Sequence, residues 1–452
     1  MKSPILRFPS RFVWGAATSS YQIEGATAAD GRGPSIWDTF CQRAGAIADG
    51  SDGVVACDHY HRMPEDVAMM RALGLKAYRF SVAWPRVLPT GRGAVNQAGL
   101  DFYSRLVDHL LAADIEPWVT LYHWDLPQAL QDEGGWPARS TAEAFAEYAH
   151  LMATHLGDRV KRWITHNEPW CASVLGHLEG VHAPGIKDQA AHLRSSHHLL
   201  LSHGLAVPII RAAVPDAQVG ITLNLVPAEP ASPSDADQAA TARFDDWFNR
   251  WYLDPLTGRG YPQRLRAAYE TEHAIEDWSF IQPGDLEIIA APSDFLGINY
   301  YTRGIIRSDR VPETDNAPRT VELEGPMTDM AWEVYPEGLR RLLTQVHADY
   351  GFPALYITEN GAAYATGPDA TGAVPDQARL DYLDGHLRAC HEAIAAGVPL
   401  AGYFAWSLMD NFEWAYGYEK RFGLVWVDYA TQARTPKASA LWYRDVITRG
   451  GL

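Results

Sequence analysis

Residues 355–361 read LYITENG, a run of strand-forming residues that ends in a glutamate, an asparagine and a glycine. Aromatic and β-branched residues favour a strand, and the glycine favours a turn directly after it. A buried strand that carries a carboxylate at its end needs an explanation, because an unpaired buried charge is costly. Residues 162–170, RWITHNEPW, repeat the arrangement with Glu168. The question is whether Glu168 and Glu359 belong to one site.

Strand-like runs of this kind recur along the chain, and amphipathic helical stretches lie between them. The predicted strands are FVWGAA (12–17), AYRFSVAW (77–84), PWVTLYHW (117–124), RWITHN (162–167), QVGITLNL (218–225), FLGINYY (295–301), ALYITEN (354–360) and GYFAWSL (402–408). Residues 65–74, 99–114 and 379–397 carry apolar residues at helical spacing. Strands that alternate with helices predict an α/β protein with a parallel sheet.

Eight strand–helix units predict a closed (β/α)8 TIM barrel, with residues 1–452 forming a single catalytic domain. An open, doubly wound sheet is the alternative fold. That fold usually has a glycine-rich phosphate loop after its first strand. The corresponding residues here, WGAATSSYQIEG (14–25), contain neither GxGxxG nor GxxxxGK[ST]. We therefore prefer the barrel.

Polar and aromatic residues gather at or just after the carboxyl ends of the predicted strands, which lie at one rim of such a barrel. They are Gln22, Glu24, Arg79, Trp84, His123, Trp124, Asp125, Asn167, Glu168, Asn299, Tyr301, Glu359, Asn360, Trp406, Asn411, Glu413 and Trp414. The irregular segments 226–238 and 307–338 also follow strands. We expect these extended loops to wall a pocket at the same rim.

Composition and charge exclude several classes of partner. The formal net charge is −17 and no lysine- or arginine-rich run is present, which argues against nucleic acid and anionic lipid. The four cysteines are scattered, so we expect neither a disulfide framework nor a zinc site. No apolar run reaches the roughly 18 residues of a membrane-spanning helix. With no signal-peptide pattern at its start, the chain is predicted to be cytoplasmic, with no metal and no cofactor.

Two carboxyl groups across a pocket lined by amides and indoles fit glycoside hydrolysis. One carboxyl must be protonated to assist the leaving group, while the other must be ionised. If they lie about 5–5.5 Å apart, the ionised carboxylate can attack the anomeric carbon and configuration is retained. An arginine beside one glutamate would keep it ionised. The residues alone do not say which glutamate Arg79 approaches.

Three motifs, in order, resemble those of glycoside hydrolase family 1, the β-glucosidase family. FVWGAATSSYQIEGA (12–26) is similar to its N-terminal signature, THNEP (165–169) to its acid/base motif and YITENG (356–361) to its nucleophile motif. The resemblance spans nearly the full chain. It implies a retaining β-glucosidase or β-glycosidase that releases terminal β-D-glucosyl residues from β-glucosides and short cello-oligosaccharides, an activity of carbohydrate metabolism and cellulose degradation.

The same resemblance implies a role for each site residue. Glu168 would be the proton donor and later the general base, and Glu359 the nucleophile, with Arg79 beside it. The expected substrate-binding residues are Gln22, His123, Trp124, Asn167, Asn299, Tyr301, Trp406, Glu413 and Trp414, and the possible aglycone contacts are Trp332, Cys171 and His182. His166 stands where the family often has an apolar residue, and we expect it to be a packed core histidine.

Several other classes remain as alternatives. A 6-phospho-β-glycosidase of the same family usually has a serine where this chain has Glu413, and a carboxylate there would repel phosphate. A thioglucosidase would lack Glu168. A non-catalytic sugar-binding barrel would not need the intact pair, and an inverting enzyme would release α-glucose from a β-glucoside. The histidines of HLRSSHHLLLSHG (192–204) are expected to be core or solvated, because no metal-site pattern accompanies them. Glycone preference and oligomeric state are not predicted.

Overall fold

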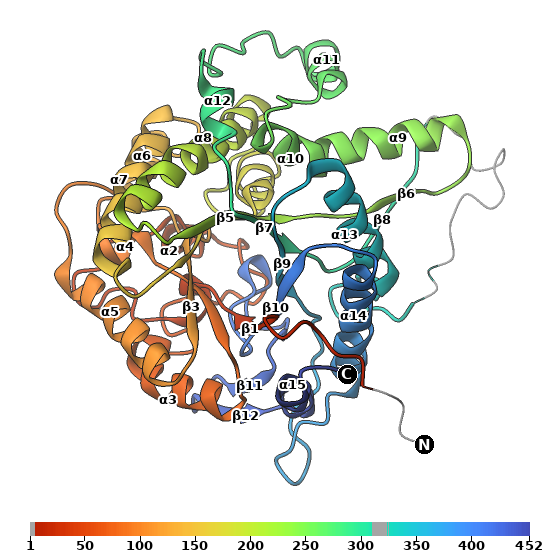
Figure 1. Cartoon of the computed structure of the whole chain (residues 1–452). Coiled ribbons are helices and arrows are strands. Elements are labelled where there is room, and N and C mark those ends of the chain that lie inside the picture. The colour runs from red at the N-terminus through yellow and green to blue at the C-terminus, as the bar shows by residue number, and fades with distance from the viewer. Residues whose placement is uncertain (1–4, 310–322, 324) are drawn as a thin grey trace.

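Eight parallel strands close into a barrel at the centre of the molecule, in the order β1-β10-β9-β7-β5-β4-β3-β2 (Figure 1). This is a computed structural model that describes residues 5–309, 323 and 325–452. The barrel strands are β1 (Val13–Ala17), β2 (Ala77–Ser81), β3 (Glu116–Tyr122), β4 (Arg162–Asn167), β5 (Gln218–Asn224), β7 (Phe295–Asn299), β9 (Leu355–Asn360) and β10 (Leu400–Trp406). Each predicted strand overlaps one of these, so the predicted barrel is confirmed.

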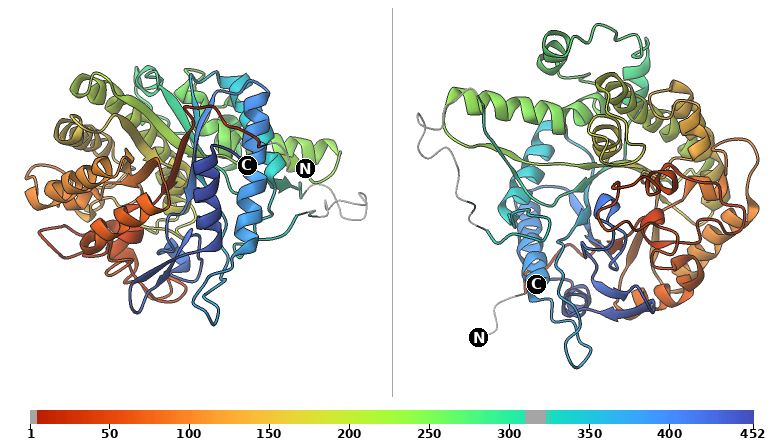
Figure 2. Two further views of the ribbon diagram at one scale, coloured as in Figure 1. Left: turned by 60° about the horizontal axis from the view of Figure 1, so that its bottom comes forward. Right: turned by 180° about the vertical axis from the view of Figure 1, so that it is seen from behind.

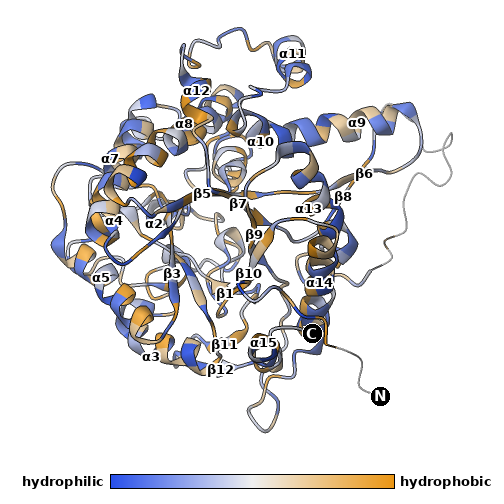
Figure 3. Cartoon of the chain, in the orientation of Figure 1, coloured by the Kyte–Doolittle hydropathy of each residue, from blue (hydrophilic) through white to orange (hydrophobic). Residues whose placement is uncertain are grey.

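Helices form a ring around the barrel (Figures 1 and 2). The long ones are α3 (His59–Ala72), α5 (Gln97–Ala112), α7 (Arg139–Leu156), α8 (Gln189–Ala213), α13 (Pro336–Tyr350), α14 (Gln377–Ala395) and α15 (Ala438–Arg449). The predicted helices correspond to α3, α5 and α14, although α3 begins earlier and contains Pro64. Figure 3 shows hydrophobic and hydrophilic residues mixed along these helices, as one buried and one solvated face require.

Shorter helices occupy the connections. They are α1 (Ser20–Ile23), α2 (Ile36–Phe40), α4 (Trp84–Val87), α6 (Gln128–Asp132), α9 (Asp235–Asp245), α10 (Trp251–Leu256), α11 (Gln263–Glu272) and α12 (Asp285–Ile289), with single turns η1 (Cys171–Leu175), η2 (Asp246–Arg250) and η4 (Trp414–Tyr416). In Figure 1, α11 lies outside the ring. Across the described ranges, no helix is both long enough and apolar enough to span a membrane.

Aromatic side chains fill the interior of the barrel. The ring of Trp118 lies 5.5 Å from that of Phe295, 4.8 Å from that of Tyr356 and 5.0 Å from that of Phe404. Gly15 makes room for this packing, because a Cβ at that position would lie 2.4 Å from the Phe404 ring. The interior is therefore a packed core, and a substrate can bind only at an end of the barrel.

One predicted loop contains regular structure. Within 226–238, strand β6 (Ala228–Pro230) pairs with β8 (Gly304–Ile306), and α9 begins where the Ser234 side chain accepts a hydrogen bond from Asp237 N. The prediction of an irregular segment was wrong here because β6 is stabilised by a partner far along the chain. Of the second predicted loop, 307–338, residues 310–322 and 324 lie outside the described residues, and α13 already begins at Pro336.

A further pair of strands, β11 (Val425–Asp428) and β12 (Ala433–Pro436), forms a hairpin after the last barrel strand. This hairpin was not predicted. Its strands are short and half-buried, and neither shows the continuous apolar run of the barrel strands. It follows the loop after β10 that carries Glu413 and Trp414.

The register of the barrel places the ends of neighbouring strands side by side. Arg79 pairs with Ala17, Asn299 with Glu359, and Asn167 with Thr222. Three irregularities in register fall near this end, in the pairings of β4 with β5, β7 with β9, and β10 with β9. Such irregularities re-aim side chains next to active sites. The predicted site residues are thus brought to one rim.

Candidate active site

Glu168 and Glu359 are both buried at the carboxyl ends of strands, with 5% and 3% of their surface exposed. Glu168 directly follows β4 in the left-handed backbone region, with φ of 47°, and its amide donates to Thr222 O at 2.9 Å. Glu359 is the fifth residue of β9. The turn that follows requires Gly361, since a Cβ there would lie 1.7 Å from Trp406 O. The TENG sequence is therefore a strand end that passes tightly against β10.

Charged and neutral donors hold Glu359. Arg79 Nη1 donates to its Oε1 at 2.6 Å, and the Tyr301 hydroxyl donates to its Oε2 at 2.6 Å. Arg79 is fully buried and is itself held by Thr120 Oγ1 and Thr358 O. Burial raises the pKa of Glu359, while the Arg79 cation and the Tyr301 hydrogen bond act in the opposite direction. Arg79 thus pairs with Glu359, the glutamate beside which the family resemblance placed it and which the residues alone did not identify.

Among the described residues, only neutral donors form hydrogen bonds with the Glu168 carboxyl. Asn299 Nδ2 donates to Oε1 at 2.6 Å, and the Cys171 thiol donates to Oε2 at 3.1 Å. Burial and the nearby negative charge of Glu359 raise the pKa of Glu168 to about 8. With the cation bonded to Glu359, Glu168 is the member of the pair that keeps its proton near neutral pH.

Asn167 links the two carboxyl groups. Its Oδ1 accepts from Arg79 Nη2 at 2.6 Å and from Asn299 Nδ2 at 3.0 Å. Its Nδ2 contacts His123 Nε2 at 3.0 Å. Burial, reinforced by the charge of Arg79, lowers the pKa of His123 well below its usual value, so the ring is neutral and Nε2 accepts. One amide hydrogen of Asn167 remains for a ligand.

Aromatic rings form a wall beside this network. The His123 ring is nearly parallel to those of Trp406 and Trp414, with centroids 5.8 and 6.0 Å away. Trp124 lies 4.6 Å from Trp414, and its indole N–H donates to Asn167 O. Flat apolar faces next to hydrogen-bonding groups suit a sugar ring, which has both apolar C–H faces and hydroxyl edges.

The predicted aglycone residues lie around the same rim. Trp332 is half-buried against Tyr301, at a centroid distance of 5.3 Å. His182 lies 5.6 Å from Trp124, and Cys171 contacts Glu168 directly. Each is therefore next to a residue of the glutamate network or its aromatic wall.

Glu413 has a buried carboxyl oxygen, Oε2, that has no hydrogen-bond partner among the described residues. Burial, with the charges of Glu359 and Glu168, raises the pKa of Glu413 to about 8. Gln22 uses its amide hydrogens on Asn411 Oδ1 at 2.9 Å and Phe412 O at 2.8 Å. A buried carboxyl oxygen without a partner calls for an explanation, and beside the two glutamates a hydrogen bond from a ligand would supply one.

Two rim predictions were wrong. Glu24 pairs with Arg86 at 2.9 Å and accepts from the Tyr103 hydroxyl. Trp84 stacks on Tyr148 with centroids 4.8 Å apart. Both belong to the packing between the barrel and its helices, because a position just after a strand does not fix the direction of the side chain. Asn224, at the end of β5, was missed: its amide contacts Cys171 Sγ at 3.6 Å. Its place at a strand end was the available signal.

The other histidines have structural surroundings. His166 is fully buried, its ring 4.4 Å from that of Phe145 and its Nε2 2.8 Å from Ser202 Oγ, which confirms a packed core histidine. In α8, His192, His197, His198 and His203 are all buried, and His197 Nε2 lies 2.9 Å from Asp285 Oδ2. In the part of the chain that the structure describes, no group of three or more His, Cys, Asp or Glu is placed to hold a metal ion.

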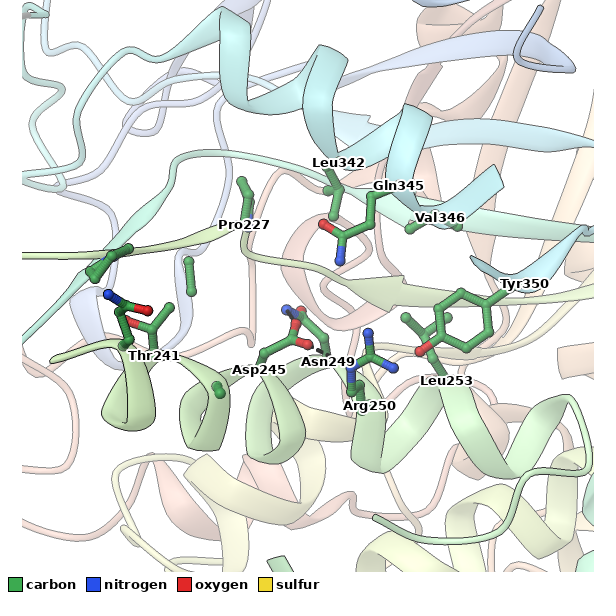
Figure 4. A pocket seen from close by; sticks show the side chains of 14 residues that line it. Pro227, Thr241, Asp245, Asn249, Arg250, Leu253, Leu342, Gln345, Val346 and Tyr350 are labelled. Atoms are coloured by element: carbon green, nitrogen blue, oxygen red, sulfur yellow. Dashed lines mark hydrogen bonds and ion pairs between the residues drawn. The ribbon is translucent and has the colours of Figure 1, made fainter. Parts of the chain in front are cut away.

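A separate cavity of about 430 Å³ lies between α9, α10 and α13 (Figure 4). Arg250 in its wall pairs with Asp245 at 2.7 Å. Neither Glu168 nor Glu359 lines it. Because Arg250 already neutralises the Asp245 carboxylate, this cavity offers no acid/base pair for hydrolysis.

Comparison with known proteins shows which family the chain resembles over its length. A model of glycosyl hydrolase family 1 matches residues 5–452. Beta-glucosidase A of Thermotoga maritima is 48% identical over 450 residues, which cover 99% of each chain. The 1,4-beta-D-glucan glucohydrolase of Thermotoga neapolitana is 47% identical over 448 residues, also 99% of each. A solved structure, beta-glucosidase from Thermotoga maritima in complex with glucoimidazole, has a TM-score of 0.93 at 46% identity and covers 99% of this chain and 100% of that one.

Proposed function

The chain belongs to glycosyl hydrolase family 1, and from that premise we propose that Glu359 and Glu168 together hydrolyse β-glucosides with retention of configuration. The substrates are terminal β-D-glucosyl residues of β-glucosides and short cello-oligosaccharides. The observation that carries the proposal is the asymmetric environment of the two glutamates. Within the described part of the chain, one is bonded to a buried arginine and the other only to neutral donors.

In the first step, the ionised Glu359 attacks the anomeric carbon and forms a covalent glycosyl-enzyme. Arg79 and the Tyr301 hydroxyl keep the carboxylate ionised and fix the direction of its oxygens. Glu168 donates its proton to the departing glycosidic oxygen, for which a pKa of about 8 suits it at neutral pH.

In the second step, Glu168 acts as the base. Departure of the aglycone leaves Glu168 ionised, and it removes a proton from the water that attacks the anomeric carbon. The bond to Glu359 breaks, and its carboxylate returns to the hydrogen bonds of Arg79 and Tyr301. Two displacements on the same carbon retain the β configuration of the sugar.

Residues around the pair would hold the glycone. The unpartnered oxygen of Glu413 can accept from a sugar hydroxyl, and the free amide hydrogen of Asn167 can donate to one. Trp406 and Trp414 supply apolar faces. The charges that act on Glu413 are those of two other glutamates. Because no cation of the described residues acts on Glu413, a phosphorylated sugar fits poorly, which disfavours a 6-phospho-β-glycosidase.

We also propose that residues 1–452 form one catalytic domain that works in the cytoplasm. Pairing of β1 with β10, near the two ends of the chain, closes the barrel and supports a single unit. The four cysteines are free, three of them buried, which suits a reducing compartment. Cell fractionation followed by an activity assay tests the location.

A kinetic panel tests the activity. Wild-type enzyme is compared with Glu359→Ala on aryl β-glycosides and on cellobiose. We expect Glu359→Ala to lose activity by about 10⁴-fold or more, because it removes the nucleophile itself. Added azide should then restore turnover of an activated aryl β-glucoside and give the α-glucosyl azide. Near-normal rates in Glu359→Ala would show that another group attacks the sugar, and an inactive wild-type enzyme would favour a sugar-binding protein.

A further inference from the structure

The two displacements described above assign no role to the contact between Cys171 and Glu168. Cys171 is the first residue of η1, the turn that begins three residues after Glu168. Its Sγ lies 3.1 Å from Glu168 Oε2 and is the only hydrogen-bond donor to that oxygen in the described structure. The thiol is buried, with 7% of the Cys171 surface exposed. A hydrogen bond from sulfur is weak, but it points at the carboxyl group that must exchange a proton.

The neighbours of the Cys171 thiol determine where its hydrogen points. Asn224 Nδ2, at the end of β5, donates to the sulfur at 3.6 Å. The sulfur thus accepts from an amide, and its own hydrogen is directed to the carboxyl. Burial and the charge of Glu168 raise the pKa of the thiol well above its usual value. The S–H hydrogen therefore stays in place throughout the pH range in which such an enzyme works.

We propose that Cys171 is a positioning residue for Glu168, and that Asn224, Cys171 and Asn299 together hold the carboxyl group in the plane from which it delivers its proton. This inference rests on the proposed function, in which Glu168 is the acid/base. Asn299 donates the shorter bond, 2.6 Å, to Oε1. The transferable proton therefore belongs on Oε2, the oxygen that faces the weaker donor.

The same contact affects the acidity of Glu168. A donor to Oε2 favours the ionised carboxylate, so the thiol lowers the pKa that burial and Glu359 raise. The titratable and charged groups that face Glu168 are Glu359 on β9, Arg79 on β2, Tyr301 after β7, Glu413 after β10 and Cys171 itself. A substitution confined to Cys171 leaves the others unchanged and isolates the thiol.

The test is the pH dependence of kcat/KM for Cys171→Ala and Cys171→Ser. The basic limb of this profile reports the acid group of the free enzyme. Loss of the donor in Cys171→Ala should move that limb upward by about 0.5 pH unit, and the stronger hydroxyl donor of Cys171→Ser should move it downward by a similar amount. Cys171→Ala should also lower kcat by about 3–10-fold on a substrate with a poor leaving group, through lost positioning.

Cys390 provides the matched control, since it is a free cysteine buried in α14. Cys390→Ala should leave the basic limb in place, whatever it does to stability. Should Cys171→Ala fail to fold, Cys171→Ser alone tests the proposal by its downward shift. Limbs that coincide with the wild type, or that move in the same direction in both Cys171 variants, would overturn the proposal.

Failure of this inference can be told apart from failure of the proposed function. If Glu168 were not the acid, Glu168→Ala would lose its activity equally on substrates with good and poor leaving groups. If only the role of Cys171 were wrong, the dependence of Glu168→Ala on the leaving group would remain, and the Cys171 profiles alone would be unshifted.

Discussion

Removal of one hydroxyl, in Tyr301→Phe, should shift the acid side of the pH profile. The Tyr301 hydroxyl donates to Glu359 Oε2 at 2.6 Å, and the Glu359 carboxyl is buried. A hydrogen bond to a charged group contributes about 1.5–3 kcal/mol. At 1.36 kcal/mol for each pKa unit, its loss should raise the pKa of Glu359 by about 1–2 units. Glu359 acts as the anion, so activity at low pH is lost first.

The assay is kcat/KM for an aryl β-glucoside as a function of pH. The acid limb should move upward by about 1–2 pH units, and the rate on that limb should fall by about 10–100-fold at a fixed pH. The basic limb, set by Glu168, should move little. Above the new acid limb, the remaining loss measures how far the hydroxyl also orients the nucleophile.

Tyr300→Phe is the matched control. Tyr300 is the neighbouring residue, but its hydroxyl donates to Tyr335 O at 2.6 Å and does not contact either glutamate. We expect this variant to lose about 1 kcal/mol of stability and to keep the wild-type acid limb. A folded Tyr301→Phe enzyme whose acid limb coincides with the wild type, or lies below it, would refute the electrostatic account of Glu359.

Two further perturbations address Glu168 and the ion pair of Asp410, which lies in the loop after β10 that carries Glu413 and Trp414. Glu168→Ala should reduce kcat on cellobiose by about 10²–10⁴-fold. The first step with a dinitrophenyl glucoside should slow far less, because that leaving group needs no proton. Equal losses on the two substrates, measured by stopped-flow kinetics, would count against Glu168 as the acid. Lys437 donates to Asp410 Oδ1 at 2.7 Å, and both side chains are fully buried. Asp410 keeps its second ion pair, with Arg421 at 2.8 Å, so Lys437→Met should cost about 1.5–3 kcal/mol in the free energy of unfolding measured by denaturant titration, and unchanged stability would contradict a stabilising buried ion pair.

The fold was predictable because the residues of each barrel strand themselves favour a strand. RWITHN (162–167) coincides with β4 from its first to its last residue. Where a prediction ran too long, the next element explains it: the strand predicted over 77–84 ends at Ser81, because Trp84 and Pro85 begin α4. The short strand β6 was missed because its stability comes from β8, which the local sequence does not reveal.

For the candidate site, the residues alone indicated which side chains gather at the rim but not how they pair. Position at a strand end brought Glu168, Glu359 and Arg79 into one candidate set. The choice of Glu359 as the partner of Arg79 depends on a contact between residues 280 positions apart. The same rule wrongly included Glu24, whose side chain turns toward Arg86. Strand-end position states where a side chain starts, whereas packing decides where it points.

The most direct test of the central claim is to trap the covalent intermediate. A 2-deoxy-2-fluoro-β-glucosyl fluoride carries a good leaving group and a fluorine that slows the second displacement, so the glycosyl-enzyme should accumulate as activity falls. Peptide mapping by mass spectrometry then locates the attached sugar. The account predicts one fluoroglucosyl group on the peptide that contains Glu359, and none on that peptide in Glu359→Ala. A label on another carboxylate, or inactivation without any covalent label, would contradict it.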